Sequence, residues 1–210
     1  GSSFDYHMTS FIFFELSEIN IDSSDVNMVI MDNQQKYFNR IIIHGTDVNI
    51  RDFAFLKSSK ELELIQINAD YLYIGHRTFF GANINEIQID CNYFNISEFG
   101  FTSCNIDQMK INTYTIESGH YSFSGATINN FIISENEVIL NSDSDINPRI
   151  TNKFKLETSK NFSSSYIDVI LAMPREIFIK CGGSCDIRPH SEYYHNFTIE
   201  NITIYADSDI

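Results

Sequence analysis

The sequence predicts a β-rich solenoid, in which coils of about 22 residues stack their short strands into a parallel sheet. Two patterns of residues repeat with this period and in a constant phase. Composition agrees, because Ile outnumbers Leu by 33 to 8 and the chain has 18 Phe. Side chains that are β-branched or aromatic fit strands better than helices.

The first pattern is an apolar residue followed three and five positions later by two more. Side chains alternate along a strand, so the last two members point to the same side and predict a short strand facing the core. From residue 16 to residue 150, successive copies begin 22 residues apart, with one step of 24, and a last copy begins at residue 199. The copies are Leu16-Ile19-Ile21, Phe38-Ile41-Ile43, Leu62-Ile65-Ile67, Ile84-Ile87-Ile89, Ile106-Met109-Ile111, Ile128-Phe131-Ile133, a slipped Ile150-Phe154-Leu156, and Ile199-Ile202-Ile204 at the end.

The second pattern is a column of phenylalanines with the same period. Small residues stand directly before each Phe and three positions after it, apart from Thr78. We expect the rings to fill each coil from the wall opposite the strand, and the small residues to let the backbone turn closely. Short turns or single helical turns are expected on the outer wall. The column consists of Phe55, Phe79, Phe101 and Phe123.

The repeats predict one solenoid domain over residues 1–210 with four parts. Residues 1–15 contain Gly1-Ser2-Ser3, which resembles a tag remnant, and an N-terminal cap. Regular repeats occupy 16–140, and an irregular loop or insertion occupies 141–165. Residues 166–210 are expected to form C-terminal coils and an irregular cap, with further strands at Tyr166, Val169 and Leu171 and at Ile177 and Ile179.

The repeat resembles a known family at particular residues. Gly75, Thr78-Phe79 and Gly81-Ala82, followed by Ile84, Ile87 and Ile89, resemble the unit of the BspA-like leucine-rich repeat, and the resemblance is strongest over residues 48–133. The segments 100–104 and 122–126 look like the same part of the unit. The resemblance implies leucine-rich-repeat-type coils, a surface or secreted location, a role in adhesion or binding, and no catalytic residues.

The strand pattern also assigns an outward face. In a leucine-rich-repeat solenoid the outward side of this sheet is the concave wall, where extended partners dock. The predicted face is polar and mixed in charge, with Ile42, Leu64 and Ile132 as exposed apolar points of the kind that can be binding hot spots. We therefore expect a protein or glycan partner at Arg40, Ile42, His44, Leu64, Gln66, Asn68, Glu86, Gln88, Asp90, Gln108, Lys110, Asn112, Asn130, Ile132 and Ser134.

Charge and motifs argue against several function classes. The formal net charge of −14 disfavours binding to nucleic acid or to an anionic membrane surface. The chain has no phosphate-binding loop, no Gly-x-Ser-x-Gly and no His-Glu-x-x-His, so we expect neither an enzyme nor a cofactor. The localisation expected from the resemblance is the cell surface or the exterior, and the sequence does not predict the oligomeric state.

Metal and thiol sites are weakly indicated. Asp52, His76, Glu98 and His120 form an outer column that we interpret as a solvated ladder of charges. The alternating Asn141, Asp143, Asp145 and Asn147 loosely resemble a calcium loop but lack its glycine and its distal Glu, so we interpret them as an acidic surface loop and expect no metal. Cys91 and Cys104 fall in inward columns and are expected to be buried thiols. The close pair Cys181 and Cys185 could form a disulfide in an oxidising compartment.

The favoured function is a non-catalytic binding or adhesion module. One alternative is a right-handed β-helix that acts on polysaccharide, for which Glu86 and Asp90 are the nearest pair of carboxylates. A second alternative is a structural spacer or assembly module whose ends stack.

Overall fold

The structure is a computed structural model. It describes residues 3–8, 18–30, 39–52, 61–140, 149–158, 162–163, 174–186 and 200–206, with the backbone alone for 3–8, 29–30, 135–140, 162–163 and 186.

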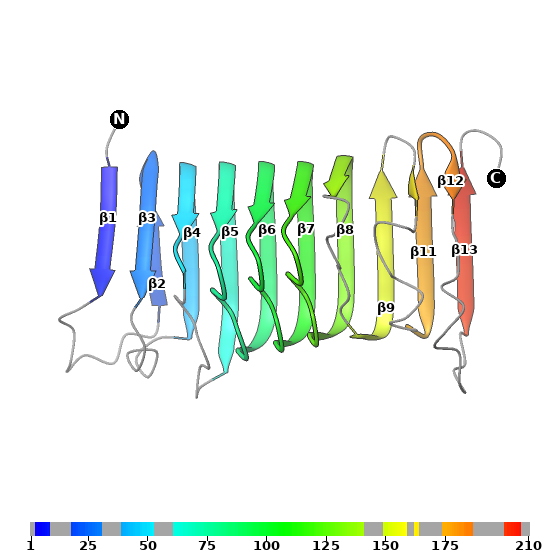
Figure 1. Ribbon diagram of the computed structural model, residues 1–210, viewed down its shortest axis with the longest axis horizontal. Helices are drawn as coiled ribbons and strands as arrows, with labels where there is room; N and C mark the ends of the chain where they lie inside the picture. The colour runs from blue at the N-terminus through cyan, green and yellow to red at the C-terminus, as the bar shows by residue number, and fades with distance from the viewer. Residues whose placement is uncertain are drawn as a thin grey trace.

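The described residues form one long sheet of eleven parallel strands, which lie side by side in chain order along the longest axis of the molecule (Figure 1). Strand β2 pairs with β4 beside β3, and β10 (Phe162–Ser163) and β12 (Cys185–Asp186) form a separate pair. No helix occurs in the described ranges, and therefore none that could cross a membrane. The long sheet contains β1 (Ser3–Met8), β2 (Glu18–Asp22), β3 (Asp25–Ile30), β4 (Arg40–Ile50), β5 (Leu62–Ile74), β6 (Asn83–Ile96), β7 (Asn105–Ser118), β8 (Thr127–Leu140), β9 (Arg149–Thr158), β11 (Glu176–Cys181) and β13 (Asn201–Ala206).

The strand register reproduces the sequence repeat. Ile65 of β5 pairs with Ile87 of β6, which pairs with Met109 of β7. The single step of 24 residues aligns Ile41 of β4 with Ile65. The predicted solenoid is therefore confirmed, with like residues stacked on like residues along the axis.

The strands are longer than the sequence pattern predicted, reaching 14 residues in β6, β7 and β8. In β5 the inward residues are Ile65, Ile67 and partly Ala69, and then Leu72 and Ile74. The alternation therefore shifts by one residue after Ala69. Each long strand thus contributes two walls to the coil, with a corner between them.

The phenylalanine column fills the core, as predicted. Phe79 and Phe101 stack with ring centres 4.9 Å apart, and Phe101 and Phe123 stack at 5.1 Å, all three fully or almost fully buried. Phe55 lies outside the described residues. Turns rather than helical segments carry these rings, and they also bond between coils, since the N–H of Phe79 donates to the carbonyl of Gly100 at 2.8 Å.

One predicted boundary is wrong. The segment 141–165 was expected to be irregular, yet β9 continues the sheet within it, with Phe131 of β8 aligned on Phe154. A one-residue bulge between Ile128 and Asn130 shifts the register, because the spacing on β9 contains one extra residue. Farther on, Ile177 and Ile179 lie in β11 as expected, whereas residues 166–171 lie outside the described residues.

Candidate functional site

The fifteen predicted partner-binding residues lie together on β4 to β8. Strand pairing arranges them in three columns, which begin with Arg40 beside Leu64, Ile42 beside Gln66, and His44 beside Asn68. The columns continue in register through β6, β7 and β8. None of the fifteen side chains is buried. We call this continuous surface the first face.

A shallow open depression of about 450 Å³ lies in the middle of the first face. Ile89 and Ile111, whose side chains are buried in the core, also contribute to its lining. The other lining residues are all among the fifteen predicted ones: Gln66, Asn68, Gln88, Asp90, Lys110, Asn112, Ile132 and Ser134.

Glu86 organises the polar side chains next to this depression. Lys110 Nζ donates to Glu86 Oε1 at 2.8 Å, and Gln88 Nε2 donates to the same oxygen at 2.8 Å. The hydrogen bond from Lys110, followed by that from Gln88, holds the pKa of Glu86 below its usual value. Glu86 is therefore an ionised acceptor at neutral pH.

Other side chains of the first face are also bonded from strand to strand. Asn112 Nδ2 donates to Asp90 Oδ1 at 3.1 Å, and Asn68 Nδ2 lies 3.0 Å from His44 Nδ1. Such contacts fix long polar side chains before any partner arrives. A partner would then lose less free energy to side-chain ordering.

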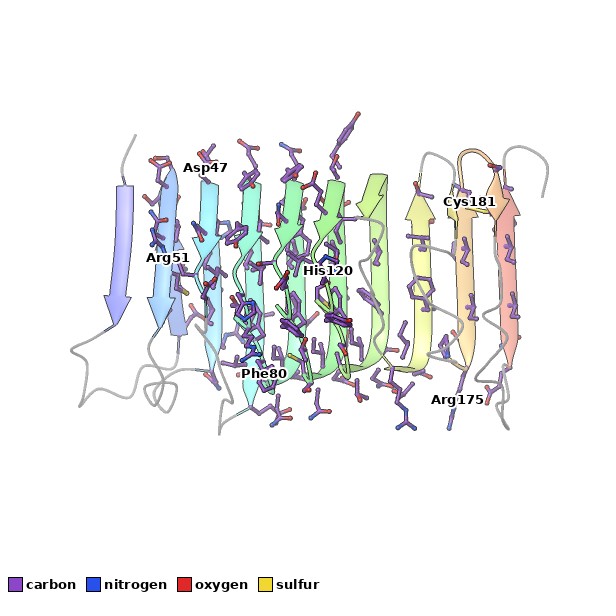
Figure 2. All side chains as sticks on the ribbon, viewed as in Figure 1. Asp47, Arg51, Phe80, His120, Arg175 and Cys181 are labelled. Atoms are coloured by element: carbon purple, nitrogen blue, oxygen red, sulfur yellow. A yellow bond between two sulfur atoms is a disulfide. The ribbon has the colours of Figure 1, made fainter. Side chains whose placement is uncertain are left out.

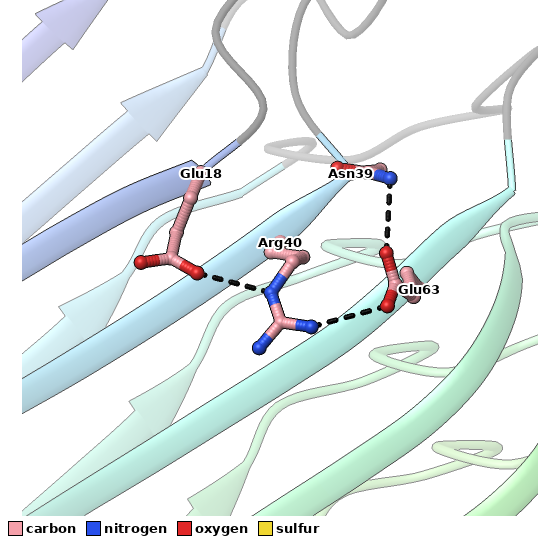
Figure 3. Close-up of polar contacts among 4 residues, drawn as sticks. All are labelled: Glu18, Asn39, Arg40 and Glu63. Atoms are coloured by element: carbon pink, nitrogen blue, oxygen red, sulfur yellow. Dashed lines mark hydrogen bonds and ion pairs between the residues drawn. The ribbon is translucent and has the colours of Figure 1, made fainter.

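Arg40 occupies the β4 side of the first face, where it is held between two carboxylates (Figure 3). Its Nε lies 3.0 Å from Glu18 Oε2 on β2, and a second guanidinium nitrogen lies 3.1 Å from Glu63 Oε1 on β5. Asn39 donates to the other oxygen of Glu63 at 3.1 Å. The hydrogen bond to Glu18 is the main cause that raises the pKa of Arg40. Arg40 therefore joins three strands and is already paired.

The first face extends beyond the fifteen predicted residues onto β9 and β11. Lys155 lies beside Ile132 in the register, 2.7 Å from Glu157 Oε2 and 5.5 Å from the ring centre of Phe178. The sequence prediction missed the part on β9 because it takes 141–165 as irregular, although the slipped Phe154-x-Leu156 copy was the available signal. For β11 the signal was the predicted strand at Ile177 and Ile179, whose neighbours Glu176, Phe178 and Lys180 point outward. The added residues are Lys153, Lys155, Glu157, Glu176, Phe178 and Lys180.

Glu86 does not suit the role of a general acid on a glycosidic bond. Such chemistry needs one carboxyl group that stays protonated near neutral pH, which requires a raised pKa. Glu86 has a lowered pKa and is paired with Lys110. The pair of Glu86 and Asp90 therefore gives no support to the polysaccharide-cleaving alternative.

A model of the BspA type leucine rich repeat region matches residues 46–166 in six copies, which is more than half of the chain. The chain belongs to the BspA-type leucine-rich repeat family. The matched range begins within β4, after His44, and extends past β10, so it covers the depression and the first face from β5 to β9. No curated protein and no solved structure matches the chain.

The outer column of this leucine-rich repeat protein is used for contacts within the solenoid. The backbone N–H of His76 donates to Asp52 Oδ1 at 2.7 Å, and the His76 ring contacts the Phe99 ring edge-on at 5.5 Å. Among the described residues, no group of three or more His, Cys, Asp or Glu could hold a metal ion. Residues 141–147 lie outside the described residues, and so do His190 and His195, the two histidines that are nearest in sequence to Cys181 and Cys185.

The four cysteines of the leucine-rich repeat protein occupy two different settings. Cys91 and Cys104 are buried free thiols, and burial raises their pKa values to about 11 and about 12. Neither is poised as a nucleophile, because the reactive thiolate is disfavoured. Cys181 at the end of β11 and Cys185 at the start of β12 are joined in a disulfide.

Proposed function

We propose that this BspA-type leucine-rich repeat protein is a non-catalytic binding or adhesion module whose first face receives a protein or glycan partner. The observation that carries the proposal is the depression of about 450 Å³ in the middle of that face, lined by polar side chains from four strands. Repeat solenoids use extended surfaces of this kind to bind partners.

Two further features support the first face as a binding surface. Ile132 lines the depression, and Ile42 and Leu64 lie half-buried on the same face among polar neighbours. Apolar side chains in a polar surround can supply the energetic centre of an interface. The bonded network around Glu86 and Lys110 supplies fixed donors and acceptors beside them.

The proposal is tested by capture of ligands on a glycan array and from host-cell or culture extracts. A triple variant, Ile42→Asp, Leu64→Asp and Ile132→Asp, should lose at least tenfold in affinity for whatever the parent captures. The matched control is the triple variant Ser97→Asp, Ser103→Asp and Ser124→Asp, which adds the same three charges in the turns that carry the phenylalanine rings. Circular dichroism must show that both variants are folded, and unchanged affinity in the triple variant would refute the proposal.

We infer that the protein works at the cell surface or outside the cell. The disulfide between Cys181 and Cys185 supports this location, because such bonds persist in oxidising compartments. Surface biotinylation of intact cells, with the mass of the recovered protein measured after thiol alkylation, tests the inference. Recovery only from lysed cells, with all four thiols alkylated, would contradict it.

End-to-end assembly is a second candidate function, and strand β13 is the observation that favours it. Ile202 pairs with Ile177, which is 7% exposed, yet Ile202 itself is 57% exposed. Stacking of a second copy on β13 would bury the Ile202 side chain. Light scattering over a concentration series should then show growing mass for the parent and constant mass for Ile202→Asp; constant mass for both rules the assembly out.

A further inference from the structure

A second outward surface runs along the other wall of the coils. It is formed by the later halves of β4 to β7, after the corner at Ala69. We call it the tyrosine face, and Asp47 is the labelled residue that belongs to it in Figure 2. The residues that define it are Asp47, Tyr71, Tyr73, Tyr93, Tyr114 and Glu117.

Tyrosine rings form the apolar part of this face. Tyr71 and Tyr93 stack with centres 5.0 Å apart and planes 8° apart, and Tyr71 and Tyr114 are 39% and 56% exposed. In the register Tyr71 lies between Tyr93 and Asp47. The stack therefore meets a short, exposed carboxylate on β4, about 4.8 Å away at the backbone, where a further ring would continue it.

Charge on the tyrosine face has one sign only. The outward segments 46–49, 70–73, 92–95 and 114–117 contain Asp47, Asp70 and Glu117 but no Lys, Arg or His. Asp70 and Glu117 accept hydrogen bonds from the neutral amides of Asn92 and Asn95. Among the described residues none of the three carboxylates forms an ion pair, in contrast to Glu86 on the first face.

The pKa values of two tyrosine hydroxyls on this face are raised, first by burial and then by the neighbouring carboxylates. Burial first, and then the charges of Glu117 and Asp47 among others, raise the pKa of Tyr71. Burial, together with the hydrogen bond to Glu117, raises the pKa of Tyr93 to about 12. The face thus offers acceptors and negative charge beside aromatic rings.

We propose that the tyrosine face binds an extended segment of a protein partner through arginine side chains. A guanidinium stacked on Tyr71 would lie within reach of the Asp47 carboxylate, so stacking and ion pairing act on the same group. Arginine fits better than lysine because its guanidinium is planar and can pair with a carboxylate through two N–H groups.

The spacing of the carboxylates sets the spacing of the arginines. Asp47 on β4 and Glu117 on β7 are three strands apart, about 14 Å along the axis, and Glu117 lies two residues beyond Thr115, the register partner of Asp47, which adds about 7 Å along the strands. The two backbone positions are therefore about 16 Å apart, and the long arginine side chains must span the small remainder beyond the rise of the bound segment. An extended chain rises about 3.4 Å per residue and returns to the same side at every second residue. Two arginines four positions apart would therefore meet both carboxylates, and the preferred segment reads Arg-x-x-x-Arg.

The test uses fluorescence anisotropy with three labelled synthetic peptides, in which the two variable positions hold Arg, Lys or Gln on a Gly-Ser backbone. The Arg peptide should bind at least threefold more tightly than the Lys peptide, and the Gln peptide should not bind. In the isosteric variant Asp47→Asn, affinity for the Arg peptide should fall about tenfold. In Tyr71→Ala it should fall about fivefold.

The variant Glu98→Gln is the matched control, because it removes one exposed carboxylate that lies in a turn outside the tyrosine face. If Glu98→Gln lowers the affinity for the Arg peptide as much as Asp47→Asn does, the peptide is held by nonspecific charge attraction and the proposal is overturned. Equal affinity for Arg and Lys peptides, or no binding of either, overturns it too. The triple Asp variant of the first face should keep full affinity for the Arg peptide. The proposals for the first face and for the tyrosine face are therefore tested independently of each other.

Discussion

The ammonium group of Lys110 on β7 lies 2.8 Å from Glu86 Oε1 on β6, at the side of the depression in the first face. The two side chains are 45% and 26% exposed, so solvent screens the pair and its net contribution to stability is about 0.5 kcal/mol. The pair fixes the position of a cation and a carboxylate that a partner would meet. The pair therefore matters more for placing these two charged groups than for the stability of the fold.

Lys110→Gln should raise the pKa of Glu86 toward its ordinary value of 4.5. Because the pKa of Glu86 is lowered in the folded protein, its ionised form stabilises the fold above about pH 4.5, and this contribution disappears as the pH falls through the folded-state pKa. Urea denaturation should show a loss of about 0.5 kcal/mol at pH 7 and almost none at pH 3. NMR titration of the carboxyl carbon gives the pKa directly.

Lys180→Gln provides the control for this effect, because Lys180 lies on β11, far from Glu86 along the axis. It removes the same charge and should leave the pKa of Glu86 unchanged. A loss of stability in Lys110→Gln that is equally large at both pH values would show that the ion pair is not its source.

Phe101→Ala should destabilise the protein by about 3–5 kcal/mol, because it removes the middle ring of a buried stack. Phe101 contacts Phe79 on one side and Phe123 on the other, and it is fully buried. The free energy of unfolding from urea titrations measures the loss. Tyr114→Ala removes an exposed aromatic ring of similar size and should cost no more than about 0.5 kcal/mol. Similar losses in the two variants would contradict a core role for the stack.

Repeated columns made the architecture and the first face predictable from the sequence. On β6, inward positions for Ile87 and Ile89 imply outward positions for Glu86, Gln88 and Asp90. Because residues 22 positions apart stack in register, the same assignment holds for the equivalent residues of each neighbouring strand. A single correct phase therefore predicted fifteen surface residues at once.

The tyrosine face was not predictable in the same way, since the alternation changes phase at the corner. Ala69 and Leu72 both point inward although they are three residues apart, so two successive residues, Asp70 and Tyr71, point outward. The alternation of inward and outward side chains is interrupted there. In the sequence, the second half of each strand therefore resembles a loop between two strands. The bulge before Asn130 had the same effect on β9, where one extra residue concealed a regular coil.

The thiols of Cys91 and Cys104 should resist alkylation in the folded protein. Burial raises their pKa values to about 11 and about 12, so thiolate is scarce at pH 8, and the core also blocks access of the reagent. Mass spectrometry after iodoacetamide treatment should find no label in native protein and two labels after urea unfolding. Rapid labelling of either thiol in the native state would show that the coil opens locally there.

Gly75→Ala should destabilise the protein by about 2 kcal/mol, because the backbone of one coil leaves no space for a side chain on the next. A Cβ at Gly75 would lie 2.7 Å from the backbone N of Asp52 and 2.8 Å from the backbone carbonyl carbon of Arg51, besides an overlap with Asp52 Oδ1. Backbone atoms cannot swing aside as a flexible side chain can, so the two coils must separate locally.

Gly125 provides the matched comparison for this prediction. Its φ is +65°, and the nearest atom to an added Cβ is Ser103 Oγ at 3.5 Å, so Gly125 needs a left-handed backbone but has open space. Asn tolerates that conformation, and Gly125→Asn should change stability by no more than about 0.5 kcal/mol. Thermal and urea unfolding of both variants measure the difference. If Gly75→Ala is as stable as Gly125→Asn, the coils at Asp52 and Gly75 are not packed as closely as the structure shows, and the spacing that aligns β4 with β5 would have to be revised.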